Sequence, residues 1–86
     1  MVIPEDVVHR MVGDEAVLLQ LDSGIYYGLD PVGSRIWELL AAHGSIRAVC
    51  ETMVEEYDVA PAQVEQDVQR LVRELQAKGL VAVAPG

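Results

Sequence analysis

The sequence has little of several residue types. Its 86 residues include one cysteine, Cys50, no phenylalanine, one tryptophan and three tyrosines. A single cysteine excludes an internal disulfide, and together with only two histidines, His9 and His43, it supplies too few ligands for a structural zinc motif. No apolar run approaches the roughly 20 residues that a membrane-spanning helix needs. We therefore expect no disulfide, no metal, no other cofactor and no membrane association.

Basic residues are also scarce. Lysine and arginine total 6 against 14 aspartates and glutamates, a formal net charge of −8. Such an acidic chain repels phosphate backbones, so nucleic acid is not expected as a partner, whereas a basic peptide or basic protein surface would be attracted. The first six residues carry acids where a secretory signal would carry bases, which predicts a cytoplasmic location. The hydrophobic content of 51% is high for one small domain spanning residues 1–86.

Three short segments rich in β-branched or aromatic residues predict strands. They are Val7–Val12, Ala16–Leu21 and Ile25–Leu29. Gly13-Asp14-Glu15 and Asp22-Ser23-Gly24 separate them and supply turn residues. The pattern predicts an antiparallel meander with two edges, and whichever edge is long and apolar is a template for a further strand.

Two helices are predicted after the strands. The first begins at Pro31 with Asp30 as its N-cap and closes at Gly44, and the second begins after Ser45. Apolar residues recur at spacings of three and four in both. The expected apolar face of the first comprises Val32, Ile36, Leu39 and Leu40, and that of the second comprises Ile46, Val49, Cys50, Met53, Val54 and Tyr57.

A third helix is predicted to begin near Pro61 and to stop at Gly79 in a Schellman motif, with Leu80 contacting Leu75. Its expected buried residues are Val64, Val68, Leu71 and Leu75, with Val72 and Asp67 on the two flanks. Leu80–Val83 is expected to add a short β-type pairing. Strands followed by helices predict an α+β fold, a winged helix-turn-helix-like arrangement of a three-stranded antiparallel sheet followed by three helices.

The residues with catalytic chemistry favour a non-enzymatic protein. Cys50 lies within an apolar stripe, where burial raises the pKa of a thiol and shields it. The adjacent acids Glu55-Glu56 and Asp14-Glu15 point apart or lie in a turn, and no phosphate-binding glycine loop or nucleophile elbow is present. A winged helix could place its last helix in the major groove of DNA. That helix, however, carries equal numbers of basic and acidic residues, whereas a helix that binds DNA concentrates basic residues.

The third predicted strand has the strongest functional pattern. Strand alternation sends Ile25, Tyr27 and Leu29 to one face and Tyr26 and Gly28 to the other, so only one set can join the core. Tyrosines beside a glycine suit an edge strand that accepts a peptide through main-chain hydrogen bonds. A purely structural strand explains the same residues equally well.

Several segments in order resemble the PqqD-type family of small peptide-binding proteins, also called RiPP recognition elements. The segments that carry the resemblance are Leu18-Leu19, Gly24, Tyr26-Tyr27-Gly28-Leu29-Asp30, Ile36-Trp37-Glu38-Leu39-Leu40, Gly44 and Leu75-Gln76-Ala77-Lys78-Gly79-Leu80. Within the family, the junction Asp-Pro-Val-Gly-Ser-Arg-Ile-Trp is most similar to the B1 component of lasso-peptide biosynthesis.

The resemblance implies that the chain binds the leader segment of a ribosomally made precursor peptide. The leader would pair with the third strand and lie in a groove against the third helix. The implied site comprises Ile25, Tyr26, Tyr27, Gly28, Leu29, Val64, Asp67, Val68, Leu71 and Val72. The carboxylate of Asp67 would suit lysines on the leader. The implied enzyme partner is a separate leader peptidase, a B2-type cysteine protease.

Three other interpretations stay open on the sequence. A PqqD protein proper would present its precursor to a radical-SAM enzyme. An acidic winged-helix regulator would bind a protein or DNA. A structural subunit would keep its apolar strand edge permanently buried in a larger complex.

Overall fold

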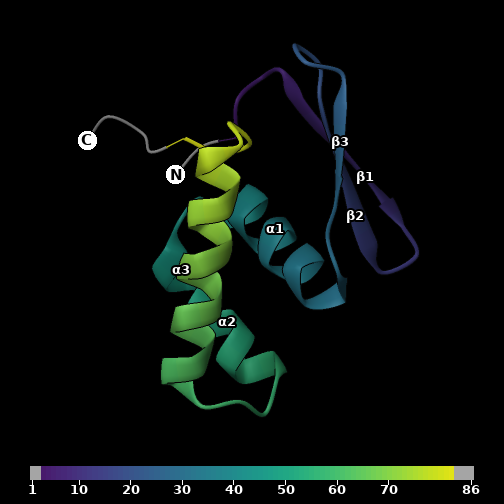
Figure 1. Ribbon diagram of the computed structural model, residues 1–86. Coiled ribbons are helices and arrows are strands. Elements are labelled where there is room, and N and C mark those ends of the chain that lie inside the picture. The colour runs from purple at the N-terminus through teal and green to yellow at the C-terminus, as the bar shows by residue number, and fades with distance from the viewer. Residues whose placement is uncertain (1–2, 83–86) are drawn as a thin grey trace.

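A computed structural model describes residues 3–82 of the chain. It contains three strands followed by three helices, as predicted (Figure 1). The elements are β1 (Val7–Val12), β2 (Glu15–Gln20), β3 (Ile25–Gly28), α1 (Pro31–His43), α2 (Ile46–Glu56) and α3 (Pro61–Ala77). Of the predicted tail pairing, Ala82 forms a single β-bridge, and Val83 lies outside the described residues.

The strands form an antiparallel sheet in the order β1-β2-β3, which confirms the meander. In the central strand β2, Leu18 stands opposite His9 of β1 and Tyr27 of β3. Gly24 in the second turn adopts a φ of 72°, a left-handed conformation that side chains disfavour. All three helices lie to one side of the sheet (Figure 1). The sheet therefore has an inner face against the helices and an outer face.

The predicted helix boundaries are confirmed by their hydrogen bonds. Asp30 Oδ1 accepts from the Gly33 N–H at 2.7 Å, and Pro31 follows it as the first helical residue of α1. At the other end of the helical region, Gly79 has a φ of 74° and the Leu80 N–H donates to the Leu75 carbonyl at 2.8 Å. That bond completes the predicted Schellman motif and brings two buried leucines together.

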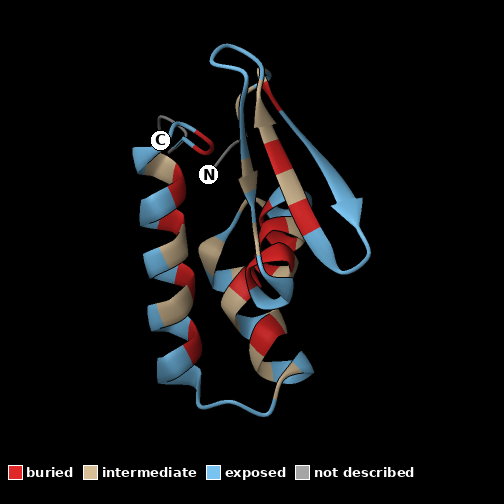
Figure 2. Ribbon diagram, turned by 45° about the vertical axis from the view of Figure 1, so that its right-hand side comes forward, coloured by how far each residue is buried: buried red, intermediate tan, exposed pale blue. Residues whose placement is uncertain are grey.

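The buried apolar residues form two clusters. One lies among the three helices and comprises Ile36, Leu39, Leu40, Val49, Met53, Val64, Val68 and Val72. The other lies between the sheet and the helices and comprises Val7, Ala16, Leu18, Trp37, Leu75, Leu80 and Val81. Leu71, partly buried, packs against both clusters. Figure 2 shows the buried residues of α3 on the side of that helix that faces the rest of the molecule.

Two core predictions need correction. Val32 is 45% exposed, because its side of the first turn of α1 faces a hollow beside α3. On α3 the fully buried stripe passes through Val68 and Val72, so Val72 is a core residue and not a flanking one. Leu71 is correspondingly turned toward the sheet and is only partly buried.

A buried serine joins α1 to the sheet where β3 ends. Ser34 is fully buried; its hydroxyl accepts from the Ala16 N–H at 2.6 Å and donates to the Leu29 carbonyl at 3.1 Å. The Leu29 N–H donates directly to the Ala16 carbonyl at 2.9 Å. The hydroxyl thus takes the place of the return bond that an ordinary antiparallel pair would make. It holds the first turn of α1 at the end of β3.

Candidate functional site

The outer edge of β3 carries main-chain groups that the sheet does not use. Bonded and non-bonded pairs alternate along an antiparallel ladder. Because the Leu29 N–H bonds to Ala16, the next bonded pair is Leu18 with Tyr27. The N–H and C=O groups of Tyr26 and Gly28 therefore point away from β2, toward the open edge.

The other side of β2 agrees with this assignment. The Leu21 N–H donates to the Asp6 carbonyl at 2.8 Å, so Leu19 and Val17 are the residues of β2 that bond to β1. Their neighbours in β2, including Leu18, consequently bond toward β3. The bonding on both sides of β2 therefore gives the same result. The N–H and C=O groups of Tyr26 and Gly28, two of each kind, are free to pair with a further strand.

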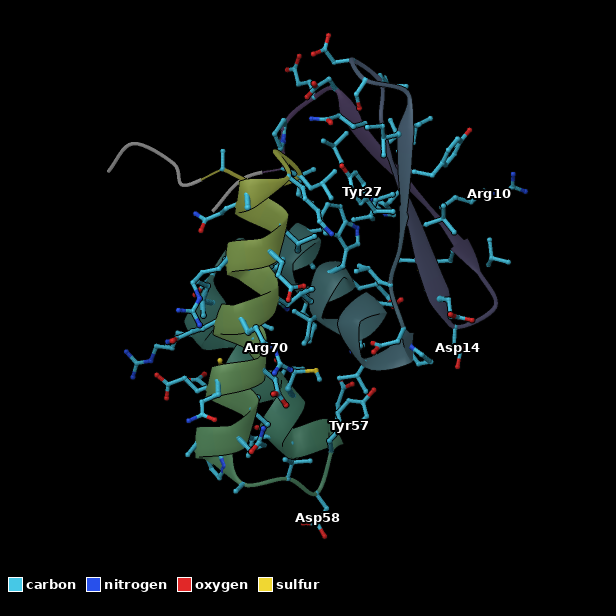
Figure 3. All side chains as sticks on the ribbon, in the orientation of Figure 1. Arg10, Asp14, Tyr27, Tyr57, Asp58 and Arg70 are labelled. Carbon is cyan, nitrogen blue, oxygen red and sulfur yellow. The ribbon has the colours of Figure 1, made fainter. Side chains whose placement is uncertain are left out.

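The open edge of β3 faces α3 across α1. Figure 1 shows α3 and the sheet on the two sides of α1. Toward the C-terminus of α3, the Lys78 Nζ lies 5.0 Å from the centre of the Tyr27 ring, a cation–π contact. Figure 3 shows Tyr27 directed into the space between the two elements. Toward the other end of α3, the space widens into a hollow.

This hollow lies between α3 and the first turns of α1, beside the end of β3, and has a volume of about 550 Å³. It is called the α3–β3 groove below. It is lined by Asp30, Val32, Gly33, Ile36, Asp67, Arg70, Leu71 and Glu74. A side chain at Gly33 would crowd this wall, because a Cβ there would lie 3.1 Å from Asp30 Oδ1 and 3.7 Å from a Leu71 methyl carbon. The groove begins where β3 ends, so a strand added to β3 would continue into it.

A smaller apolar pocket of about 170 Å³ adjoins the groove and shares Val32, Ile36 and Asp67 with it. Its other lining residues are Met53, Tyr57, Val59, Val64 and Val68. The size and lining of this pocket suit one apolar side chain of a guest peptide. The groove thus offers polar contacts along a bound peptide, and the pocket offers a site for one apolar side chain.

The groove is acidic. Three carboxylates line it, those of Asp30, Asp67 and Glu74, against one guanidinium, that of Arg70. Asp67 Oδ1 accepts from Gln63 Nε2 at 3.0 Å and from an Arg70 nitrogen at 3.3 Å, which holds the carboxylate at the groove wall. With a chain charge of −8, the groove favours a guest that carries basic side chains.

The structure brings most of the predicted site residues to one region. Tyr26 and Gly28 are exposed on the open strand, and Tyr27 and Leu29 are half-buried beneath it. Asp67 and Leu71 line the groove, whereas Val64 and Val68 line the pocket. Two predicted residues stand apart. Ile25 is 49% exposed at the turn end of β3, and Val72 is buried in the helical core and lines neither hollow.

The sequence reasoning missed several lining residues. Arg70 and Glu74 follow Asp67 at helical spacings, so extending the face of Asp67 along α3 would have found them. Val32 lines the groove as well, although the apolar pattern of α1 predicts it for the core. Ser34, which fixes the position of α1 beside the open edge, had no signal in the sequence, because its partners are 18 and 5 residues away.

Residues with catalytic potential lie elsewhere. Burial raises the pKa of the Cys50 thiol, and the nearby carboxylates of Glu65 and Glu51 raise it further, so the reactive thiolate is disfavoured. The His9 ring stands edge-on to Trp37, with 5.8 Å between ring centres. Within residues 3–82, no three histidine, cysteine or acidic side chains come together to hold a metal ion. None of the described helices is both long and apolar enough to cross a membrane.

Comparisons with known proteins agree with this arrangement. A family model described as coenzyme PQQ synthesis protein D (PqqD) matches residues 15–81. The structure of TbiB1 in complex with the TbiA(beta) leader peptide is 38% identical in sequence, covers 100% of both chains and superposes with a TM-score of 0.92. A lasso peptide synthetase B1 complexed with the leader peptide is 25% identical, covering 94% of this chain and 95% of its own, with a TM-score of 0.85. No curated protein matches the chain.

The family model spans all but the first strand and the two ends of the chain. The TbiB1 structure adds the first strand, because its match extends over the full length. These matches confirm the resemblance and the fold that were drawn from the sequence. The chain belongs to the PqqD family.

Proposed function

We propose that this protein binds the leader segment of a ribosomally made precursor peptide, of the lasso-peptide type, by adding the leader to β3 as a fourth strand. The observation that carries the proposal is the open edge of β3, whose free main-chain groups at Tyr26 and Gly28 end beside the α3–β3 groove. Both solved structures compared above are complexes of B1-type proteins with a leader peptide, which supports the same ligand class.

The expected binding free energy has two sources, which are the main-chain hydrogen bonds to β3 and the burial of a leader side chain in the pocket. Four main-chain hydrogen bonds at about 1 kcal/mol each give about 4 kcal/mol without selecting a sequence. One apolar side chain buried in the pocket adds about 1.5–3 kcal/mol and provides selectivity. A dissociation constant of roughly micromolar follows once the cost of ordering a flexible peptide is included. Val64, Asp67, Val68 and Leu71 are the α3 residues that we assign to side-chain recognition.

Leader capture requires no bond-making residue in this chain. We infer that the protein is not an enzyme and that it presents the bound precursor to a separate leader peptidase, a cysteine protease of the B2 type. Holding the leader extended raises the effective concentration of the cleavage site at the protease. Because precursor peptides are made by ribosomes, the proposed setting is the cytoplasm.

A fluorescence-polarisation titration tests the ligand class. The probes are a labelled leader peptide of the precursor encoded beside this chain and, in a parallel titration, a labelled DNA duplex. The proposal expects saturable binding of the peptide and no binding of the duplex at moderate salt. Duplex binding without peptide binding would instead support a winged-helix regulator and would refute leader capture.

A further inference from the structure

Lys78 is the only lysine of the chain, and its side chain lies over β3. Its Nζ is 5.0 Å from the centre of the Tyr27 ring. Arg35, Arg47 and Arg70 form ion pairs with acidic side chains. Lys78 forms none within residues 3–82, although the chain has 14 acidic residues. Its charge is therefore balanced only by the face of an aromatic ring.

The end of α3 places Lys78 near the start of β3. The Schellman motif that follows it turns the chain toward the sheet, and a Cβ at Gly79 would lie 3.0 Å from Gln20 Nε2. Gln20 stands opposite Ile25 in the pairing of β2 with β3. Figure 1 shows the C-terminal end of α3 and the start of β3 at the same end of the molecule. The cation thus lies at the Ile25 end of the open edge.

The α3–β3 groove lies at the opposite end of the strand. Asp30 follows β3 closely, and its carboxylate lines the groove with those of Asp67 and Glu74. The extended chain from Ile25 to Asp30 spans about 17 Å at about 3.4 Å per residue. A peptide bound along β3 therefore meets a cation near one end of the strand and carboxylates near the other.

We propose that Lys78 is a specificity-determining residue of the leader site and forms an ion pair with an acidic side chain of the leader. This inference rests on the proposed function and deepens it, because it specifies the charge pattern of the bound peptide. The leader carries an acidic residue opposite the start of β3 and a basic residue in the groove. Electrostatic complementarity at the two ends then selects both the sequence and the register of the leader.

Strand alternation sets the spacing of these two leader residues. Every second side chain of a leader paired with β3 points to the inner face of the sheet, where Lys78 lies over Tyr27. Only those side chains reach Lys78 and the groove, so the acidic and basic residues of an extended leader are an even number of positions apart. The span of about 17 Å corresponds to about four or six positions. In a leader antiparallel to β3, the basic residue comes first in the sequence.

Fluorescence polarisation at low salt tests the proposal with the labelled leader of the precursor encoded beside this chain. Lys78→Glu should weaken leader binding by about tenfold, because repulsion replaces attraction, and high salt should reduce the difference. Lys78→Arg keeps the charge and should retain affinity within about twofold. The matched control is Arg73→Glu, which makes the same charge change at an exposed position of α3 outside the groove. It should bind the leader within about twofold of wild type.

Two further measurements separate an ion pair with the leader from a purely structural role. A leader whose acidic residue is replaced by lysine should restore the affinity lost in Lys78→Glu, whereas a cation that only covers Tyr27 or offsets the helix dipole gives no such rescue. Carbodiimide coupling joins a carboxylate to an amine in contact with it. It should link the leader to Lys78, as mapped by mass spectrometry, and Lys78→Arg should give no link at that position.

The outcomes distinguish failure of this inference from failure of the proposed function. If the wild-type protein binds the leader and Lys78→Glu binds it equally well at low salt, recognition by Lys78 is refuted while leader capture stands. Weaker binding by Lys78→Glu without rescue by the lysine-bearing leader would assign Lys78 a structural role and overturn the inference. If the wild-type protein does not bind the leader, the proposed function itself fails.

Discussion

Replacing Gly28 by proline is the most discriminating perturbation of the leader site. The Gly28 N–H points to the open edge and takes no part in the pairing of β2 with β3, so a proline there removes a donor that the sheet does not need. A Cβ at Gly28 meets nothing within 4 Å. We therefore expect the variant to fold and to lose leader binding.

The expected loss can be worked out from the edge geometry. A guest strand forms a close pair of hydrogen bonds with the N–H and C=O of Gly28, and the proline ring occupies the place of the guest carbonyl that accepts from the N–H. The displaced guest loses both bonds, about 2 kcal/mol at about 1 kcal/mol each. That loss corresponds to roughly a 30-fold weaker dissociation constant at room temperature. Fluorescence polarisation with a labelled leader measures it.

Matched variants distinguish the loss of the binding edge from a loss of the folded structure. Gly28→Ala keeps the N–H and should bind within about twofold of wild type. Met11→Pro places a proline on the opposite edge of the sheet and should also bind normally. Tyr27→Pro is a poor test, because the Tyr27 N–H faces β2 and its loss disrupts the sheet itself. Wild-type affinity in Gly28→Pro, with a native circular dichroism spectrum, would refute strand addition.

Three further predictions concern stability and charge. Ser34→Ala should lower the free energy of unfolding by about 1–3 kcal/mol, measured in urea, because the buried Ala16 N–H loses its acceptor; an unchanged value would show that the hydroxyl is dispensable. Hydrogen bonding to Arg35 lowers the pKa of Glu56, so the stability from this pair is present above the ordinary carboxyl pKa of 4.5 and is lost as pH falls through the lower folded value. Glu56→Gln should therefore lower the thermal midpoint at about pH 7, and the difference from wild type should shrink as pH falls below 4.5, whereas a difference that stays constant with pH would contradict the assignment. Asp67→Ala should weaken binding of a lysine-bearing leader by up to about fivefold at low salt and have no effect at high salt; unchanged affinity at low salt would exclude Asp67 from recognition.

The local elements were predictable from the sequence, because their signals are local. Asp30 followed by Pro31 sets the start of α1, since the cap and the fixed φ act within one turn. Gly79 sets the end of α3 in the same way, through its left-handed conformation. Strand alternation separated Tyr27 from Tyr26, and the structure places the first half-buried and the second exposed.

Only the tertiary structure decided what these elements do together. The pairing register depends on contacts between strands, so the free N–H of Gly28 and the bonded N–H of Tyr27 could not be told apart beforehand. The rotation of α3 depends on packing against α1 and α2, which buries Val72 and turns Leu71 toward the groove. The groove exists because elements distant in sequence meet across α1, and no periodicity within one segment records such a meeting.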